Sequence, residues 1–257
     1  MRRVKKVDRV PLLKRALKEG IIDLAFLDSE TSLCKAVVWG TGEQYVSEDN
    51  IVEESRVIMV QWMLESEGKP YHKTWDKEHN DGPAIEHLIN HVLNKDNMII
   101  IGHNHKKFDL KVLNNRAKDL NLLPIENSIR IDTLQSSRSA FKAVSHKLDY
   151  KSKMYGLGGK IVTKMQLWKD VLNDVPGSVH LMAKYGIKDI TDLHTIFWKE
   201  LPYYDNIPAE LETILLGMKA KCLKCEEYKK PKYELERCKV KGKNGWLCLN
   251  CGGRFTL

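Results

Sequence analysis

The sequence lacks several features that define large classes of proteins. It has no apolar run of the roughly 20 residues that a membrane-spanning helix needs, and no apolar segment follows its basic start as in a secretory signal peptide. Internal repeats and low-complexity tracts are also absent. With 257 residues and 42% hydrophobic content, the sequence predicts a soluble cytoplasmic protein that has one substantial core, a small appendage and no membrane partner.

Cysteine is scarce, yet four of the six cysteines form two C-x-x-C pairs. The pairs are Cys222 with Cys225 and Cys248 with Cys251, separated by 22 residues, slightly more than the roughly 15–20 usual for zinc sites. A disulfide would need an oxidising compartment, and a redox-active pair would need a thioredoxin-like context that is absent. We therefore expect a zinc ribbon with one structural Zn²⁺, because four thiolates leave no position open for water.

Two cysteines lie outside these pairs. Cys238 lies between the pairs and could replace one of the four ligands. Cys34 is close to an apolar stretch, and we expect it to be buried in the core.

Positive charge is concentrated at the two ends of the chain. Residues 1–20 carry a net charge of +6 and residues 217–257 carry +7. Because the whole chain carries +8, the residues between them carry −5. Basic ends are suited to phosphate contacts with nucleic acid. For the N-terminal segment, an ordinary solvent-exposed surface explains the positive charge equally well.

Acidic residues follow a predicted central strand. The apolar run 21–27 leads directly into Asp28 and Glu30. Residues two apart share a face in extended chain, so both carboxylates can reach one hard cation. A single D-x-E triplet is common on protein surfaces, so this pattern needs support from elsewhere in the chain.

A second acidic residue follows another buried strand. The run 98–101 stops at Gly102, and leucines at helical spacing follow Asp109. Asp109 is therefore predicted in the first turn of a helix beyond a strand end, where ligands bind in open α/β sheets. The alternative is that Asp109 only stabilises the helix through its dipole and that Asn104 only caps the helix.

A third pattern places Tyr185 and Asp189 four residues apart in a stretch with helical periodicity. The phenol and the carboxylate then share one face of a helix. The alternative is an amphipathic helix with a half-buried tyrosine. The three motifs together have the acids that hold two divalent ions for phosphodiester cleavage.

Other polar residues were weighed against this set. Asp132 ends a short apolar run and precedes Thr133, so a helix N-cap is the preferred interpretation rather than a metal ligand. His103 and His180 could act as general bases in principle, but we leave them out of the catalytic set.

The pattern of apolar residues predicts an α/β fold with a mixed sheet flanked by helices. Strands are expected near 21–28, 34–39, 56–64 and 98–102, and helices near 84–95, 109–121 and 186–200. We divide the chain into a basic N-terminal segment (1–20), a catalytic domain (21–205), and a linker with the ribbon (206–257). The stretch 202–208 resembles a hinge, and 209–217 could form a short joining helix.

The order D-S-E-T, then G-H-N-x-x-x-F-D-x-x-x-L, then Y-x-x-x-D resembles the DnaQ-like 3′–5′ exonucleases of the ribonuclease-H-like superfamily. It is similar to the proofreading domain of family B DNA polymerases and to free-standing phage exonucleases. The resemblance spans roughly residues 21–205 and also includes 38–40, 130–133 and 158–160. A sibling subclass has histidine where this chain has Lys184, so Tyr185 places it in the DEDDy subclass.

The resemblance implies a role for each matching acid. Asp28 would bridge two metal ions, Glu30 and Asp189 would complete the first metal site, and Asp109 would hold the second ion. Tyr185 would orient the attacking water. The ions would be Mg²⁺ or Mn²⁺, because oxygen ligands suit both.

Three further residues match positions that contact the terminal nucleotide in the family. They are Thr31, Asn104 and Phe108. Their alternative roles, given equal weight, are strand-end capping, helix capping and core packing respectively.

The resemblance implies hydrolysis of DNA from the 3′ end to nucleoside 5′-monophosphates, in the cytoplasm of a bacterium or a phage-infected host. Single-stranded or frayed 3′ ends are the expected substrate, and a replication or repair protein could bind through the ribbon. One alternative is an RNA exonuclease with the same site, since no motif reads a 2′-hydroxyl. Another is a nonenzymatic binding or scaffold protein, although all four carboxylates are present.

Overall fold

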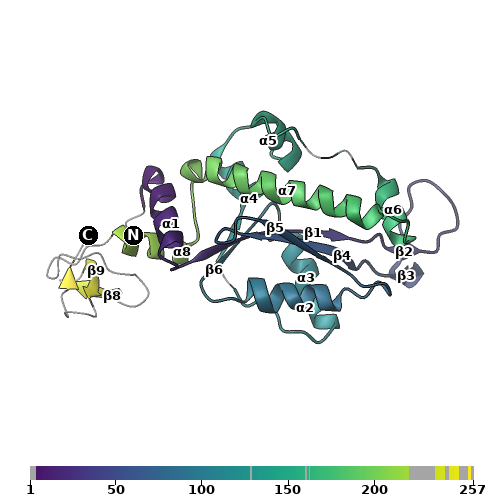
Figure 1. Ribbon diagram of the computed structural model, residues 1–257, viewed down its shortest axis with the longest axis horizontal. Coiled ribbons are helices and arrows are strands. Elements are labelled where there is room, and N and C mark those ends of the chain that lie inside the picture. Colours follow the sequence, from purple (N-terminus) through teal and green to yellow (C-terminus); the bar gives the residue numbers. More distant parts are fainter. Residues whose placement is uncertain are drawn as a thin grey trace.

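The computed structural model of the protein describes residues 4–127, 129–159, 161 and 163–219, and the backbone of 235–240, 243–248 and 254–255. Within these ranges, no helix combines the length and the apolar character that crossing a membrane requires. The molecule is elongated, with the N-terminal helix and the C-terminal strands toward one end and a projecting arm at the other (Figure 1).

A five-stranded mixed sheet forms the centre of the fold, in the order β5-β4-β1-β6-β7. The strands are β1 (Asp23–Thr31), β4 (Val57–Leu64), β5 (Pro70–Thr74), β6 (Met98–Gly102) and β7 (Arg130–Asp132). β1 pairs antiparallel with β4 and parallel with β6, so it is hydrogen-bonded on both edges. The predicted mixed sheet flanked by helices is confirmed.

Helices cover both faces of the sheet. The long α7 (Ser178–Glu200) lies along one face, and α2 (Gly82–Leu88) and α3 (Asp109–Asp119) lie on the other (Figure 1). Leu24 and Phe26 of β1 pack with residues of α7, whereas the alternate residues Ala25 and Leu27 pack with α2 and α3. This alternation decides which face of the sheet each later β1 side chain takes.

Three further helices connect these layers. They are α4 (Thr133–Ala140), α5 (Leu148–Met154) and α6 (Met165–Leu172). The predicted helix near 84–95 is α2, which continues as one π-helical segment over Ile89–Leu93. The predicted strands 56–64 and 98–102 agree with β4 and β6.

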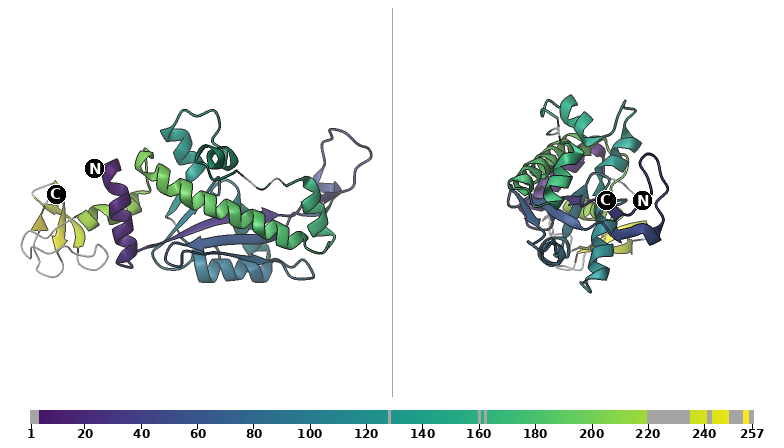
Figure 2. Two further views of the ribbon diagram at one scale, coloured as in Figure 1. Left: turned by 45° about the horizontal axis from the view of Figure 1, so that its top comes forward. Right: turned by 90° about the vertical axis from the view of Figure 1, so that its right-hand side faces the viewer.

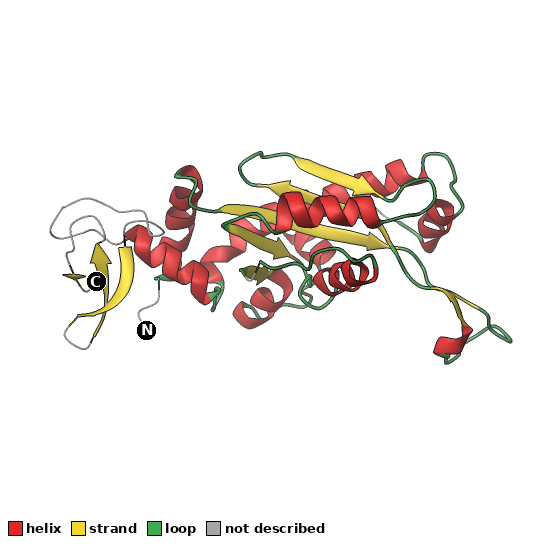
Figure 3. Cartoon of the chain, turned by 90° about the horizontal axis from the view of Figure 1, so that it is seen from below, coloured by secondary structure: helices red, strands yellow, loops and turns green. Residues whose placement is uncertain are grey.

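The predicted strand 34–39 is wrong. Only β2 (Lys35–Ala36) forms there, and it pairs with β3 (Ile51–Glu53) in a separate two-stranded ribbon. The chain between them includes a short 3₁₀ turn (Glu48–Asn50) and projects from the body as an arm (Figures 2 and 3). Val37 and Val38 have strand propensity, but the main sheet offers them no position, so they are exposed.

Cys34 lies at the start of this arm. Its side chain is exposed, so the prediction of a core cysteine is wrong. The reason is the same: the chain leaves the main sheet at Thr31, before Cys34 could be covered by a neighbouring strand.

The N-terminal residues fold against the body of the protein. α1 (Arg9–Lys18) packs against α8 (Ala209–Lys219), and Leu13 and Ala16 are buried in the same core as residues of α7. The basic segment 1–20 therefore also contributes an apolar helix face to the core. The boundaries at residues 20 and 205 stay a prediction.

Basic side chains of the N-terminal segment bind the stretch that the sequence suggested as a hinge. The buried Arg9 donates from Nη1 to the carbonyl of Tyr204 and from Nη2 to that of Asp205, the latter at 3.4 Å. Lys6 Nζ lies 2.8 Å from a carboxylate oxygen of Asp205. A 3₁₀ turn (Leu201–Tyr203) ends α7 just before these contacts.

A small three-stranded sheet lies near the C-terminus, in the order β10-β9-β8. Its strands are β8 (Leu235–Val240), β9 (Lys243–Cys248) and β10 (Arg254–Phe255). Cys222, Cys225 and Cys251 lie outside the described residues, as do the side chains of Cys238 and Cys248. The zinc ribbon therefore stays a prediction.

Arg9→Ala should lower the free energy of unfolding by about 2–3 kcal/mol, because two carbonyls lose a charged hydrogen-bond donor in a buried setting. Urea denaturation followed by circular dichroism measures this loss. Arg15→Ala removes a partly exposed pair with Glu19, and it should cost less than about 0.5 kcal/mol. Equal losses in the two variants would contradict a structural role for Arg9.

Candidate active site

The first two acids lie on the face of β1 that α7 covers. Phe26 fixes this face, because its ring meets His194 and Phe197 of α7 at centroid distances of 4.9 and 5.6 Å. Asp28 and Glu30 follow Phe26 at intervals of two residues, so they share its face. Glu30 is buried and Asp28 is half-buried. The predicted i, i+2 arrangement is thus present at the carboxyl end of the strand.

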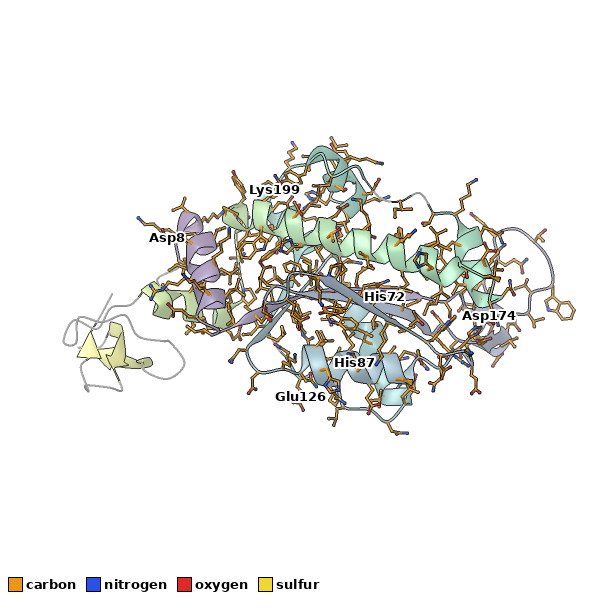
Figure 4. All side chains as sticks on the ribbon, viewed as in Figure 1. Asp8, His72, His87, Glu126, Asp174 and Lys199 are labelled. Carbon is orange, nitrogen blue, oxygen red and sulfur yellow. The ribbon has the colours of Figure 1, made fainter. Side chains whose placement is uncertain are left out.

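α7 brings the third motif to the same face. The helix runs antiparallel to β1: Phe26 lies beside its C-terminal half, whereas Gln61, which opposes Asp28 in the sheet, lies against Gly186. Figure 4 marks the two ends of α7, with Lys199 at one end and Asp174 just before the other. The N-terminal half of α7 therefore lies beside the end of β1.

Tyr185 and Asp189 belong to that N-terminal half of α7. Both are buried, and four residues of helix place them on neighbouring turns of one side. The ring of Tyr185 meets Trp168 of α6 edge-on, with 6.2 Å between centroids. The fold thus brings the first and third motifs to one region of the sheet, although they are about 160 residues apart in sequence.

The second motif reaches β1 from the opposite layer. Asp109 begins α3, seven residues beyond the end of β6, as the sequence predicts. The hydroxyl group of Ser29 donates a hydrogen bond of 2.6 Å to a carboxylate oxygen of Asp109. Because Ser29 alternates with Asp28 and Glu30, this bond ties α3 to the middle residue of the first motif.

Burial raises the pKa of the Asp109 carboxyl, and the hydrogen bond from Ser29 offsets part of this rise. In the metal-free chain, the ionised form of Asp109 is therefore disfavoured relative to an exposed aspartate. A nearby divalent cation would reverse this preference, because it favours the charged form.

The acids are gathered at one end of the sheet without forming a closed cage. Among the described side chains, no group of three or more His, Cys, Asp and Glu residues is arranged to hold a metal ion. The donor chemistry nevertheless suits a hard divalent cation, because these side chains offer carboxylate oxygens.

Asp132 holds the loop that leads to Asp109. As predicted, it is the N-cap of α4, and its Oδ1 accepts from the backbone N–H groups of Leu134 and Gln135. It also accepts from the N–H groups of Asn104 and Lys106 in the second motif. This second role was not predicted, since sequence alone did not show that β6 and β7 end side by side.

His105 was also missed, and it supports the same loop. Its ring is completely buried, and burial lowers its pKa to about 4 even though Asp132 lies 3.7 Å away. A side chain at Gly102 would meet the His105 ring at 2.6 Å, so glycine permits this close approach. A neutral imidazole thus fills the space under the loop at neutral pH.

The three candidate substrate contacts lie around these acids. Phe108 is 45% exposed, which contradicts core packing as its role. Asn104 adopts a positive φ of 72°, and Phe108, not Asn104, occupies the N-cap position of α3. Thr31 ends β1 beside a register shift after Glu30. Contact of these residues with a nucleotide stays a prediction.

Asp109→Asn should raise the melting temperature of the metal-free protein at pH 7, because the buried carboxylate loses its charge but can still accept from Ser29. The sign follows from the raised pKa of Asp109: its ionisation destabilises the fold as pH rises through that pKa. The gain should therefore shrink as pH falls toward 3.8. Differential scanning calorimetry across this range measures the gain, and a less stable Asn variant at pH 7 would contradict it.

Comparison with solved structures finds the family B DNA polymerase of the hyperthermophilic archaeon Pyrobaculum calidifontis. The alignment has 13% sequence identity and a TM-score of 0.49, and it covers 86% of this chain. The chain spans 31% of the length of that polymerase. The comparison with curated proteins found no significant match.

Comparison with family models finds one domain. Residues 77–157 match the exonuclease domain of DNA polymerase family B. The matched stretch contains Asp109 and Asp132, whereas the motifs at 28–30 and 185–189 lie outside it. The match supports an exonuclease domain of the family B polymerase type, centred on the second motif.

Proposed function

We propose that the protein is a metal-dependent 3′–5′ exonuclease that hydrolyses DNA to nucleoside 5′-monophosphates. The observation that carries this proposal is the position of α7, whose Tyr185 and Asp189 lie beside the strand end with Asp28 and Glu30. The hydrogen bond from Ser29 to Asp109 holds the remaining acid next to β1. The family match to the second motif supports the same activity independently.

Two divalent ions, Mg²⁺ or Mn²⁺, are the proposed cofactors. Asp28, Glu30 and Asp189 would hold one ion, and Asp28 with Asp109 the other. When bound, such a pair activates water and stabilises charge on the attacking and leaving oxygens. The raised pKa of Asp109 is in keeping with this assignment, because a nearby cation would offset the burial that disfavours the ionised carboxyl.

Side chains of the protein would position the substrate and exclude bulk water. Tyr185 is buried against Trp168, so its hydroxyl is held in place to orient the attacking water. Phe108 exposes its ring next to Asp109 and would stack on the terminal base. Asn104 and Thr31 would contact the terminal nucleotide from the two neighbouring strand ends.

The substrate would be a single-stranded or frayed 3′ end of DNA. Unpaired ends can enter a site at the ends of the central strands without separation of a duplex. Positive charge at the chain ends would attract phosphates, although Lys6 and Arg9 already bind residues 203–205. The C-terminal module would add contacts to nucleic acid or to a replication or repair protein.

Wild-type protein with Mg²⁺ should shorten a 3′-unpaired DNA oligonucleotide labelled at its 5′ end, one nucleotide at a time. Asp28→Ala should lose at least about 100-fold in rate, because it removes a ligand to both ions. Denaturing electrophoresis of the products measures both rates. EDTA should abolish cleavage.

The controls separate this proposal from its alternatives. Asp23→Ala removes another β1 carboxylate, one that binds Ser66 at the far end of the strand, and it should keep most activity. Cleavage by Asp28→Ala at the wild-type rate would refute the proposed site. Cleavage from the 5′ end only would refute the proposed 3′–5′ polarity. An RNA oligonucleotide of the same sequence decides between DNA and RNA as substrate.

We further propose that Cys222, Cys225, Cys248 and Cys251 hold one structural Zn²⁺. Elemental analysis should find about one zinc per chain, and Cys248→Ser should lower it because a tetrahedral site loses one thiolate. Cys34→Ser is the matched control, since that thiol is exposed and distant in sequence. Zinc-free protein with unchanged stability would refute the site.

A further inference from the structure

Gln61 is a polar residue in an apolar position. It lies in the middle of β4 and is completely buried, and its neighbours on the same face are Met59 and Met63. Within the part of the chain that the structure describes, neither its amide nitrogen nor its amide oxygen has a hydrogen-bond partner. Burying an amide without partners costs free energy. Packing alone therefore does not explain glutamine at this position.

Gln61 lies beside the first candidate metal ligand. In the antiparallel pairing of β1 and β4, its Cα is directly opposite that of Asp28. Directly opposed residues project from the same face, with Cβ atoms about 4.5–5.5 Å apart. The carboxamide and the Asp28 carboxylate are therefore neighbours on the face that α7 covers.

Gln61 also determines how closely α7 approaches the sheet. A methyl group at Gly186 would lie 2.5 Å from Cδ and 2.9 Å from Cγ of Gln61, and nearer still to its amide nitrogen. Apart from proline, glycine is the least favourable residue for a helix interior, so its presence here indicates a close contact. Gly186 follows Tyr185 directly and precedes Asp189 by three residues.

We infer that Gln61 is a positioning residue for the proposed exonuclease site, an inference that rests on the proposed function. Its carboxamide fills the space at Gly186 and thereby sets the position of Tyr185 and Asp189 against β1. Its N–H group is the donor that orients the Asp28 carboxylate when the site binds its ions. Hydrogen bonds to metal-binding carboxylates are a general means of orienting them.

The test replaces Gln61 by methionine, which keeps the length of the side chain and removes the amide. Metal-free Gln61→Met should melt at or above the temperature of the wild type, because a buried amide is lost. Its affinity for Mn²⁺, measured by isothermal titration calorimetry, should fall about tenfold. The kcat for DNA should fall while KM for DNA stays unchanged. Met63→Leu, on the same face of β4, should change neither the Mn²⁺ affinity nor the kinetic constants.

The outcomes separate the inference from the proposed function. Wild-type protein that neither binds Mn²⁺ nor cleaves DNA would refute the proposed function. Wild-type protein that does both, with Gln61→Met within about threefold of it in Mn²⁺ affinity, would overturn only the role of Gln61. A lower melting temperature with unchanged affinity would show a structural role alone.

A second pair of variants tests the contact with α7. Gly186→Ala should lower both the melting temperature and the Mn²⁺ affinity, because the added methyl group displaces the helix. Adding Gln61→Ala to it should restore the melting temperature but not the affinity. Additive losses of melting temperature in the double variant would overturn the contact, since residues in contact show non-additive effects.

Discussion

The packing of one helix on one strand is the constraint on which the rest of the structure depends. α7 meets β1 at Phe26 and meets β4 at Gln61, so two contacts at different points fix both its distance from the sheet and its rotation. The acids of β1 and α7 share a region only because these apolar and close-packed contacts hold. The candidate site is therefore a consequence of core packing rather than of attraction between its own groups.

Polar contacts play the complementary part on the other side of the sheet. Asp132 binds four backbone N–H groups, two from the loop after β6 and two from the first turn of α4, and Ser29 binds Asp109. Carboxylates are strong acceptors for backbone donors, so these bonds fix the second motif in a segment with little regular structure. The buried, neutral His105 fills the space below without adding charge. Packing thus positions the first and third motifs, and hydrogen bonding positions the second.

Much of this arrangement could be predicted from the sequence, because each acid lies within or next to a strongly periodic element. The buried runs before Asp28 and Asp109 indicated β1 and β6. The helices that contain Asp109 and Asp189 were also expected. Local patterns failed where tertiary structure decides: β-branched residues at 37–38 suggested a strand over 34–39, whereas only a two-residue strand outside the main sheet forms there. The second function of Asp132 and the contact of Gln61 with Gly186 depend on which elements end side by side, and no local pattern carries that information.

The continuity of α7 has a consequence for how such a chain can change over evolution. The anchor Phe197 and the site residues Tyr185 and Asp189 belong to a single uninterrupted helix. Deleting one residue between them would rotate the acid by about 100° relative to the anchor. An exposed segment such as the arm between β2 and β3 can lengthen or shorten at little cost, whereas the number of residues between anchor and acid cannot change. Insertions and deletions should therefore be excluded from this stretch even where substitutions are tolerated.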